Sequence, residues 1–318
     1  MQTPNSDNQN PDIVFELALS PAFNRDGICF AARSSGLYRS ADGGKTWQYL
    51  YNRINPASPL PTTSIALSHS FANDGVIYAA VPGGILRSDN GGIDWTVAIL
   101  PTPTPTINTL CISPEHGNDG LLFAGTLEDG VFRSSDRGST WAAVNIGLFD
   151  YPIASLAVSP NFSSDKMLFA GCSSGIFLSQ NGGLGWRDIP TWRARNSAVS
   201  ALACSPDFAN DQTLFAAAED DGLFCSTDLG SSWTKLAEAA QTGAISRIIL
   251  SPNFTHDRQV ILLNNDAILL TDALASGWQT RWQNPDDESS LLCLAGPLGG
   301  SFDDPFLVGT STGAILKV

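Results

Sequence analysis

Ser40-Ala41-Asp42-Gly43-Gly44-Lys45-Thr46-Trp47 is the stretch of this chain that decides the fold, because it occurs in six copies. Close copies run over residues 134–141 and 226–233, and looser copies end at Trp95, Trp186 and Trp278. The final tryptophans stand at positions 47, 95, 141, 186, 233 and 278, so the steps between them are 48, 46, 45, 47 and 45 residues. A nearly fixed period of this size indicates an array of equal supersecondary units.

A second motif, the Ser-Pro motif, has the same period and precedes each copy of the first. It reads Ser20-Pro21-Ala22-Phe23-Asn24-Arg25-Asp26 in its first copy. Further copies occupy residues 68–74, 113–119, 159–165, 205–211 and 251–257, and only the copy at 113–119 lacks the phenylalanine. Another step of 46 residues from Asp257 leads to Asp303. The chain is therefore predicted to contain seven units, of which the seventh is incomplete.

One unit, residues 152–190, reads as four short strands. Apolar runs at 153–158, 167–170, 176–179 and 186–189 alternate with Gly, Pro, Asn and Asp residues that favour turns. Four antiparallel strands in each of seven units predict an all-β fold, a seven-bladed β-propeller of four-stranded blades whose last blade is incomplete. We expect residues 1–12 to form a polar N-terminal segment and residues 13–318 to form this single propeller.

The first motif, which we call the box, joins the third strand of a unit to its outermost strand. We expect its aspartate to accept hydrogen bonds from N–H groups of its own turn. Its glycines allow positive φ, and its tryptophan is expected to fill the space between two blades. The structural residues of the boxes are Asp42, Trp47, Asn90, Trp95, Asp136, Trp141, Asn181, Trp186, Asp228, Trp233 and Trp278.

The phrase Ser-x-Asp-x-Gly-x-Thr-Trp, complete at residues 40–47 and 134–141, resembles the Asp-box, or BNR, repeat. The resemblance covers about residues 13–318 and implies the propeller fold. Proteins that carry this repeat include sialidases, xyloglucan-active glycoside hydrolases, the sorting receptor sortilin and photosystem assembly factors of the plant HCF136 kind. The resemblance therefore implies an architecture and leaves the activity open.

The closure of the ring involves both ends of the chain. Val318 stands where the repeat spacing would place the start of a seventh box, so the last unit has only three predicted strands. The same spacing places Gln2 in register to supply a fourth strand. Residues 3–8 are, however, poor strand formers. We expect the seventh blade to be three-stranded or weakly completed.

Composition bounds the class of partner and the compartment. The net charge of −14 argues against binding of nucleic acid or of an anionic membrane surface, because both need a basic face. No apolar stretch approaches the roughly 18 residues of a membrane span. The polar start of the chain lacks the features of a signal peptide. We expect a cytoplasmic protein, or an extracytoplasmic one if a signal peptide has been removed.

Cysteine and histidine usage argues against a metal site or cofactor. The chain has six cysteines and no CxxC pair. We interpret them as buried thiols in a reducing compartment, with a disulfide or metal set as the alternative. His69, His116 and His256 fall in the same turn of different units, so they cannot converge on a metal ion. We expect no cofactor.

Strand alternation places the boxes and Ser-Pro motifs on one face of the propeller, the box face. The loops between second and third strands and the connections between blades are expected on the opposite face, the loop face, which usually carries the site in this family. Candidate ligand-binding residues there are Tyr51, Arg53, Tyr151, Trp192, Arg195, Glu219, Asp220 and Trp282. Exposed aromatics beside carboxylates suit sugar stacking or a protein hot spot. The alternative is that each aromatic caps the edge of a neighbouring blade.

The longest blade connection, residues 51–63, contains Pro56, Pro59 and Pro61. Proline restricts the backbone, so we expect a rigid surface loop that serves either as a spacer or as the rim of a pocket.

These observations favour a non-catalytic binding or assembly module that presents its loop face to a protein segment or a glycan. The alternative is a glycoside hydrolase or lectin that acts on a polysaccharide through the same face. Hydrolysis needs two carboxylates roughly 5–10 Å apart, and the candidate pairs are Asp129 with Asp221 and Asp266 with Asp287. A sialidase is disfavoured, because the arginines of the best candidate triad all directly precede a box serine: Arg39, Arg87 and Arg133.

Overall fold

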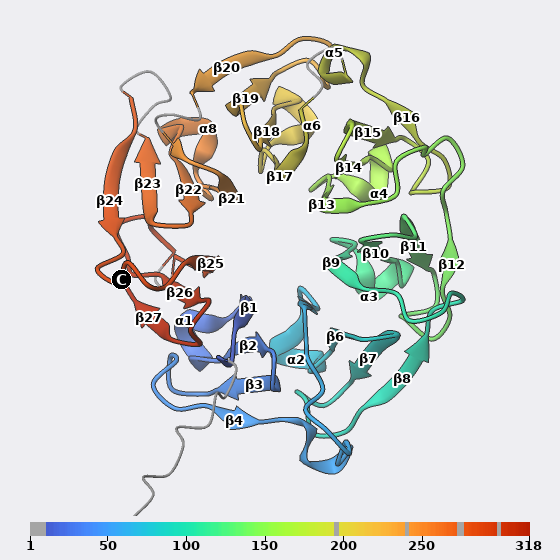
Figure 1. The fold of residues 1–318 in the computed structure, drawn as a ribbon. Helices are drawn as coiled ribbons and strands as arrows, with labels where there is room; N and C mark the ends of the chain where they lie inside the picture. Colours follow the sequence, from blue (N-terminus) through green and yellow to red (C-terminus); the bar gives the residue numbers. More distant parts are fainter. Residues whose placement is uncertain (1–10, 194–196, 239–241, 272–276, 298–299) are drawn as a thin grey trace, which may run out of the picture.

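The computed structural model describes residues 11–193, 197–238, 242–271, 277–297 and 300–318. Seven antiparallel sheets are arranged as blades around a central axis (Figure 1). In each sheet the strands follow one another in chain order from the axis outward, so each blade is a meander. Within the described residues, six blades have four strands and the seventh has three. The predicted seven-bladed β-propeller is confirmed.

The strands are assigned to the blades as follows. Blade one contains β1 (Val14–Leu19), β2 (Cys29–Arg33), β3 (Gly36–Ser40) and β4 (Gln48–Tyr49). Blade two contains β5 (Ser64–Leu67), β6 (Ile77–Val81), β7 (Gly84–Ser88) and β8 (Thr96–Ile99). Blade three contains β9 (Ile107–Ile112), β10 (Leu122–Thr126), β11 (Val131–Ser134) and β12 (Ala142–Ala143). Blade four contains β13 (Ile153–Val158), β14 (Leu168–Cys172), β15 (Gly175–Ser179) and β16 (Arg187–Asp188).

The remaining blades repeat this plan. Blade five contains β17 (Val199–Cys204), β18 (Leu214–Ala218), β19 (Gly222–Ser226) and β20 (Thr234–Ala237). Blade six contains β21 (Ile245–Leu250), β22 (Val260–Asn264), β23 (Ala267–Thr271) and β24 (Gln279–Gln283). Blade seven contains β25 (Leu291–Ala295), β26 (Leu307–Thr310) and β27 (Ile315–Lys317).

Each Ser-Pro motif of blades one to six forms a single helical turn between the first two strands. These turns are α1 (Phe23–Asp26), α2 (Phe71–Asp74), α3 (His116–Asp119), α4 (Phe162–Asp165), α6 (Phe208–Asp211) and α8 (Phe254–Asp257). Asp165 accepts a hydrogen bond from Ser159 Oγ at 2.6 Å and another from the N–H of Met167 at 2.8 Å. The serine and the aspartate thus fix both ends of the turn, which explains why both residues recur.

The box turns follow the expected hydrogen-bonding scheme. In blade one, Asp42 Oδ1 accepts hydrogen bonds from the N–H groups of Lys45 and Thr46 at 3.0 and 2.9 Å. The hydroxyl of Ser40 donates to the same oxygen at 2.7 Å. Trp47 Nε1 donates to the carbonyl of Gly44 at 3.1 Å, which orients the indole. The hydrogen bonds within the box therefore fix the turn and the orientation of its tryptophan.

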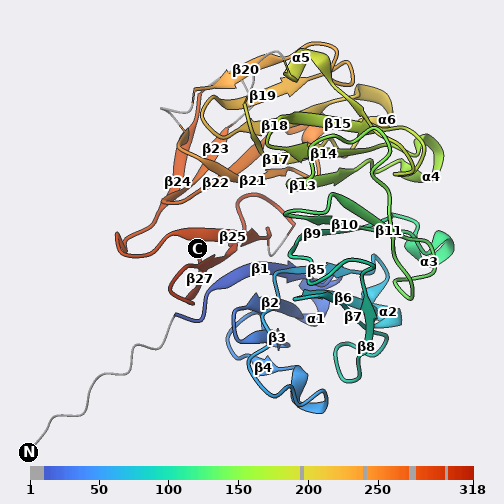
Figure 2. The same ribbon diagram turned by 45° about the vertical axis from the view of Figure 1, so that its right-hand side comes forward.

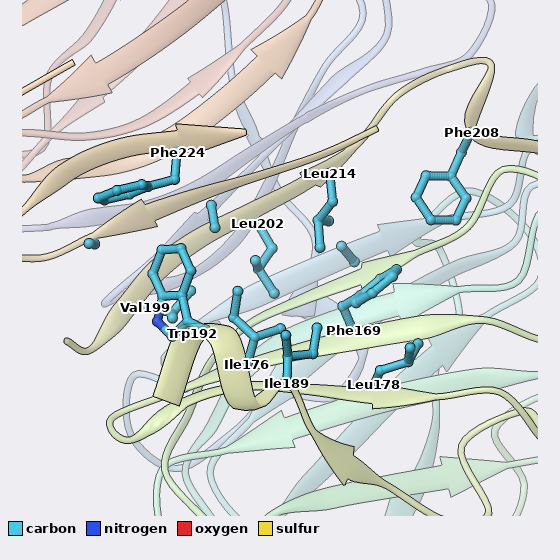
Figure 3. Packing of buried hydrophobic residues seen from close by; sticks show 13 residues of the cluster. Phe169, Ile176, Leu178, Ile189, Trp192, Val199, Leu202, Phe208, Leu214 and Phe224 are labelled. Carbon is cyan, nitrogen blue, oxygen red and sulfur yellow. The ribbon is translucent and has the colours of Figure 1, made fainter. Parts of the chain in front are cut away.

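The hydrophobic core is divided among the junctions between neighbouring blades. In the described part of the chain there are seven clusters of buried side chains, and each draws on two consecutive blades. At the junction of blades four and five, Phe169 meets Phe208 with ring centroids 5.7 Å apart (Figure 3). The box tryptophan Trp233 packs against this cluster. Each blade is therefore stabilised chiefly by its neighbours.

An aromatic pair recurs at five junctions, always edge to face. Four pairs join phenylalanines at centroid distances of 5.4 to 5.7 Å: Phe30 with Phe71, Phe123 with Phe162, Phe169 with Phe208, and Phe215 with Phe254. Between blades two and three the pair is Tyr78 and His116, at 5.5 Å. His116 thus takes the place of the phenylalanine that this copy of the Ser-Pro motif lacks.

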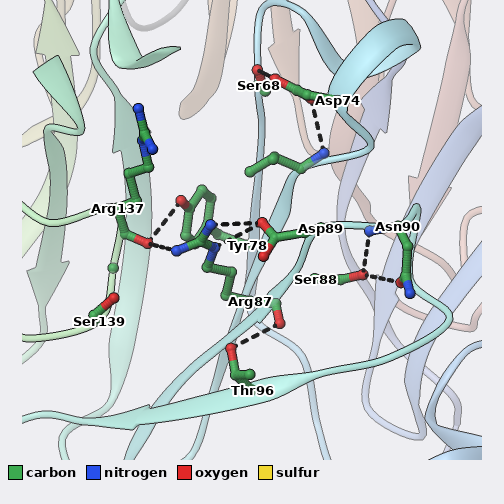
Figure 4. Close-up of polar contacts among 12 residues, drawn as sticks. Ser68, Asp74, Tyr78, Arg87, Ser88, Asp89, Asn90, Thr96, Arg137 and Ser139 are labelled. Atoms are coloured by element: carbon green, nitrogen blue, oxygen red, sulfur yellow. Dashed lines mark hydrogen bonds and ion pairs between the residues drawn. The ribbon is translucent and has the colours of Figure 1, made fainter. Parts of the chain in front are cut away.

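The polar pair brings hydrogen bonds into the junction of blades two and three. Tyr78 Oη lies 3.0 Å from His116 Nε2 and 3.0 Å from the carbonyl oxygen of Arg137, which also accepts from Arg87 (Figure 4). His116 Nδ1 is 3.2 Å from the carbonyl of Leu121 and therefore carries a proton. Burial lowers the pKa of His116, so the imidazole is neutral in the folded protein at pH 7.

Among the residues that the structure describes, the cluster at the junction of blades six and seven contains no box tryptophan. Trp282 of β24 packs there instead, against buried Phe302 and Phe306. The ring closes between blades seven and one, where Val14 packs with Leu307 and β25 lies beside β1 (Figures 1 and 2). Residues 2–7, which could complete blade seven, lie outside the described residues, so the expectation of a three-stranded or weakly completed blade is not tested there.

None of the described helices has the length and apolar character needed to cross a membrane. All six cysteines are free thiols, and four of them are buried. Burial raises the pKa of Cys29 and Cys225 to about 11. These two thiols are therefore protonated at neutral pH and are poor nucleophiles.

Candidate functional site

The two faces of the ring are built from different connections, because successive strands of a blade are antiparallel. At the box face, the box of each of blades one to four is hydrogen-bonded to the Ser-Pro turn of its own blade, and in blade one the N–H of Gly43 donates to the carbonyl of Gly27 at 3.0 Å. At the loop face, hairpins meet blade connections, and the N–H of Leu127 donates to the carbonyl of Thr106 at 3.0 Å.

The innermost strands surround a central channel that holds two cavities. The cavity toward the box face has a volume of about 490 Å³ and is lined mainly by apolar strand ends such as Leu19 and Leu250, together with Glu16 and Arg247. The cavity toward the loop face, which we call the channel pocket, has a volume of about 410 Å³. Its polar lining includes Ser64, Asn108, Ser155, Ser200 and Ser246.

Polar side chains of the channel pocket connect neighbouring inner strands, which belong to different sheets. Ser64 Oγ accepts a hydrogen bond from the N–H of Leu110 at 3.0 Å. Ser155 Oγ accepts one from the N–H of Leu202 at 3.1 Å. These bonds satisfy backbone donors at sheet edges that would otherwise be unpaired. The wall of the pocket is therefore both polar and fixed.

Glu16 of β1 and Arg247 of β21 are the charged residues that line the channel pocket. Both precede the serine of a Ser-Pro motif by four positions, so they lie at the same level of the channel. Cys293 occupies the matching register in β25 of blade seven, between them. Its small side chain leaves room for the side chain of Arg247 to reach toward Glu16.

The carboxylate of Glu16 is held firmly, whereas the guanidinium of Arg247 is not. Glu16 Oε2 accepts hydrogen bonds from Ser64 Oγ and from the N–H of Ile65, both at 2.7 Å. Glu16 Oε1 lies 3.5 Å from Arg247 Nη2, and within the described residues this is the one hydrogen bond recorded for that guanidinium. The side chain of Arg247 is 44% exposed. A guanidinium has five N–H donors. Arg247 lines both channel cavities, so its donors beyond the one that faces Glu16 are open to a ligand or to solvent.

The expectation of exposed aromatics is wrong for Tyr51 and Trp192, which are both fully buried. Tyr51, in the 3-10 turn η1 (Tyr51–Arg53), packs on Trp95 at 5.5 Å. Trp192, in α5 (Pro190–Arg193), packs on Trp233 at 4.8 Å. Each residue covers the box tryptophan of the next blade. The half-buried Trp282 fills the junction of blades six and seven, so all three cap blade edges.

The remaining aromatic and basic candidates are dispersed. Arg53 Nη1 lies 2.6 Å from Asp94 Oδ1 in the box of blade two, so its predicted place on the loop face is wrong. Tyr151 is 45% exposed, and its carbonyl accepts a hydrogen bond from the N–H of Gly130 in a loop-face hairpin at 3.2 Å. Arg195 lies outside the described residues.

The acidic candidates lie apart from the channel pocket. Glu219 and Asp220 are exposed beside the β18–β19 hairpin, and Asp221 forms an ion pair with Lys235 at 2.6 Å. Asp129 accepts a hydrogen bond from Thr102 at 3.1 Å. Asp129 and Asp221 belong to blades three and five, which blade four separates. The carboxylates offered for hydrolysis line none of the cavities described here: Asp129, Asp221, Asp266 and Asp287.

Sequence reasoning missed Glu16 and Arg247, although a signal for them exists. Aligned on the Ser-Pro motifs, they are charged residues at an inner-strand position where other blades have small side chains. Those side chains are Ser64, Thr109, Ser155, Ala201 and Cys293. Among the residues that the structure describes, no three His, Cys, Asp or Glu side chains gather closely enough to hold a metal ion.

No protein-family model and no curated protein matches this chain. Solved structures share its fold at low identity. A structure of YCF48 bound to a D1 peptide has 14% identity and a TM-score of 0.72, covering 97% of this chain and 93% of that one. YCF48 from Cyanidioschyzon merolae has 16% identity and a TM-score of 0.68, with 97% and 95% covered. The GH74 enzyme of Niastella koreensis has 16% identity and a TM-score of 0.71, with 97% of this chain but only 52% of the enzyme covered. These similarities concern the fold alone.

Proposed function

We propose that this protein is a non-catalytic binding module that holds a protein segment at its loop face, with one end of the segment in the channel pocket. The observation that carries the proposal is the guanidinium of Arg247. It has unused donors and stands in a polar pocket of about 410 Å³ on the loop-face side of the channel.

The chemistry of the pocket suits the carboxylate end of a peptide. A guanidinium binds a carboxylate through two parallel hydrogen bonds, which gives both strength and orientation. Glu16 is already fixed by Ser64 and Ile65, and its remaining lone pairs accept from peptide N–H groups. The volume lies within the usual range of roughly 300–1,000 Å³ for ligand sites. A short chain end therefore fits the pocket in size and in polarity.

The comparisons support a peptide as the class of ligand. YCF48, which has the same fold over nearly the whole of both chains, was solved with a D1 peptide bound. The 14% identity carries no residue-level correspondence, so the argument for Arg247 comes from the geometry of this pocket.

The glycoside hydrolase alternative has less support. The channel pocket contains one carboxylate, Glu16, and two short hydrogen bonds already engage it. A hydrolase needs a second carboxylate across the scissile bond, and the acidic candidates of the loop face lie elsewhere. The GH74 enzymes that share the fold are about twice as long as this chain.

A fluorescence-polarisation screen of peptides with free C-terminal carboxylates tests the proposal. We expect binders, and we expect amidation of the peptide or the change Arg247→Ala to weaken binding by about thirtyfold, because hydrogen bonds between charged groups contribute about 1.5–3 kcal/mol. Arg25→Ala, which removes an exposed arginine from α1 on the box face, is the matched control and should leave binding unchanged.

Two results would contradict the proposed function. The first is a screen in which no peptide binds to the folded protein. The second is a peptide that binds Arg247→Ala and wild type equally well. Circular dichroism of each variant separates loss of binding from loss of fold.

A further inference from the structure

A further cavity lies beside the β2–β3 hairpin of blade one, outside the channel. It has a volume of about 440 Å³, and we call it the tyrosine pocket. Its lining includes Tyr38, Tyr49, Asn52, Asn55, Pro56 and Pro59. Tyr38 and Tyr49 come from β3 and β4, and the other four come from the connection to blade two. This connection is the longest between any two blades of the chain, so the repeat does not predict the pocket that it forms.

The aromatic wall of the tyrosine pocket is preorganised. The rings of Tyr38 and Tyr49 are 5.4 Å apart and tilted by 58°, and Tyr49 meets Tyr51 edge to face at 5.8 Å. Tyr51 is fully buried, and its hydroxyl is hydrogen-bonded to Thr62 Oγ1 at 2.7 Å. A buried, hydrogen-bonded ring thus supports two half-buried rings that face the cavity. A ligand would find these rings already in place.

The hairpin is shaped to admit the ring of Tyr49. A Cβ atom on Gly36 would lie 2.6 Å from the ring of Tyr49, far inside van der Waals contact. Gly36 also has φ of 144°, a conformation that other residues rarely adopt. The glycine at this position therefore lets the Tyr49 ring lie directly against the backbone of the hairpin.

The rim of the tyrosine pocket is stiff and polar. Pro56 and Pro59 restrict the backbone of the connection, and Asn55 adopts a positive φ of 49° within it. The N–H of Thr62 donates to the carbonyl of Arg33 at 3.0 Å and ties the end of the connection to blade one. Of the two expectations for this connection, spacer or pocket rim, the cavity supports the rim.

Every residue that lines the tyrosine pocket is uncharged, although the protein has a net charge of −14. Arg33 and Arg53, which adjoin the lining residues Tyr38 and Asn52, are each paired with a carboxylate. Arg33 pairs with Asp12 at 3.2 Å and lies over the ring of Tyr38, and Arg53 pairs with Asp94 at 2.6 Å. A charged ligand would find no countercharge in the pocket. The polar groups on offer are hydroxyls and side-chain amides.

We propose that the tyrosine pocket binds a neutral pyranose sugar, as part of a glycan. A pyranose ring has an apolar C–H face, which packs on an aromatic ring, and hydroxyls around its edge. Tyr38 Oη is 2.9 Å from Ser35 Oγ, and Asn52 Nδ2 donates to the carbonyl of Tyr49 at 3.0 Å. The hydroxyls of Tyr38 and Tyr49 and the amides of Asn52 and Asn55 keep further donor and acceptor capacity for the edge of the sugar. This site is separate from the channel pocket and does not rest on the proposed function.

Fluorine NMR of protein labelled with 3-fluorotyrosine tests the proposal directly, because the chain has only five tyrosines. The probes are cello-, xylo-, manno- and chito-tetraose, with sialyllactose as a charged sugar and a proline-rich hexapeptide as a rival ligand. We expect at least one neutral tetraose to shift the signals of Tyr38 and Tyr49. The signals of Tyr78, which is fully buried, and Tyr151, on the far side of the loop face, should stay in place.

Variants localise the effect. Tyr49→Ala should weaken sugar binding by about tenfold, the size of one good aromatic contact, and Tyr49→Phe should weaken it less because the ring remains. Tyr151→Ala is the matched control with no expected effect. Ala57→Trp fills the pocket from an exposed position of the rim, so it blocks binding without disturbing the core.

Three results would overturn the proposal: no tetraose shifts Tyr38 or Tyr49, the hexapeptide alone shifts them, or Ala57→Trp binds the sugar as wild type does. Arg247→Ala should bind sugar normally. Failure of the channel pocket as a peptide site is therefore distinguishable from failure of this site.

Discussion

The box face and the loop face of this propeller differ in how faithfully they repeat. In six blades the hydroxyl of the Ser-Pro motif donates to its aspartate at 2.6 Å, without variation. At the loop face, by contrast, blade one has a tyrosine pocket and blades one and six supply the charges of the channel pocket. Features common to all blades stabilise the ring, whereas features that occur once are available for recognition. Changes at the box face should therefore affect stability, and changes at the loop face should affect binding.

The substitution Phe162→Ala should have the largest effect on stability and tests whether the repeated features stabilise the ring. Phe162 is fully buried at the junction of blades three and four and meets Phe123 at 5.7 Å. Its loss should lower the free energy of unfolding by about 3–5 kcal/mol, the usual effect of truncating a buried phenylalanine. Guanidinium denaturation measures the loss. The folded fraction should bind peptide and sugar as wild type does.

Ile146→Ala is the control for that experiment, since Ile146 is 77% exposed in the connection between blades three and four. Its effect should stay within about 0.5 kcal/mol, as is usual for surface positions. If Phe162→Ala lowered the free energy of unfolding by less than about 1 kcal/mol, the aromatic pairs would contribute less to stability than their recurrence indicates.

A smaller effect is expected at the one junction where the aromatic pair is polar. Burial lowers the pKa of His116 from the ordinary 6.5. At a pH between the lowered pKa of the folded protein and the ordinary pKa, His116 binds a proton in the unfolded chain but not in the folded protein. Stability is therefore lost as pH falls below about 6.5. His116→Phe restores the residue of the other blades and should flatten the fall in stability between pH 7.5 and pH 5. Tyr78 keeps the carbonyl of Arg137 as a partner.

Urea midpoints of wild type and His116→Phe across that pH range give the result as a difference, in which the other histidines cancel. Two parallel curves would mean that the neutral imidazole has no influence on the junction.

The smallest expected effect concerns the acid end of the pH range. Hydrogen bonds from the hydroxyl and N–H of Ser232, and from Ser226, lower the pKa of Asp228 from the ordinary 3.8. The stability that this carboxylate contributes is present above pH 3.8 and is lost as pH falls through the lowered value. Asp228→Asn should be well tolerated, because Asn90 and Asn181 stand at the same position in other boxes.

Thermal unfolding of Asp228→Asn at pH 5 and pH 3 measures this effect. The variant should lose less stability than wild type over that interval. An equal or greater loss in the variant would assign the acid sensitivity to other carboxylates.

The repeat made the fold predictable from the sequence, because each box contains its own partners. The chemistry of Ser40, Asp42 and Thr46 determines the turn without reference to the rest of the chain. The aromatic pairs were harder to foresee, since Phe123 and Phe162 lie in different units and meet only through the packing of blades. The box tryptophans pack against the clusters between blades, where a large ring at a fixed position in each unit has a fixed place.

The site was less predictable because the length of the outer strands is not encoded in the period. β4, β12 and β16 have two residues each, whereas β8 has four. After a short strand, the connection crosses the box tryptophan of the next blade, which buries Tyr51 and Trp192. Glu16 and Arg247 depart from the small residues at the matching positions of the other repeats, but they stand on inner strands, where the sequence pattern indicates packing and not a site.

The closing junction of the ring has a consequence for synthesis on the ribosome. The Sγ of Cys293 lies 3.6 Å from the carbonyl oxygen of Val14, across 279 positions of the chain. Blade one therefore emerges early with the flank formed by Val14 and Leu17 uncovered, and it stays so until blade seven has been translated. Contacts so distant in sequence form slowly. An apolar flank that stays uncovered until blade seven has been translated is a natural point for a chaperone to bind the nascent chain, or for two nascent chains to associate.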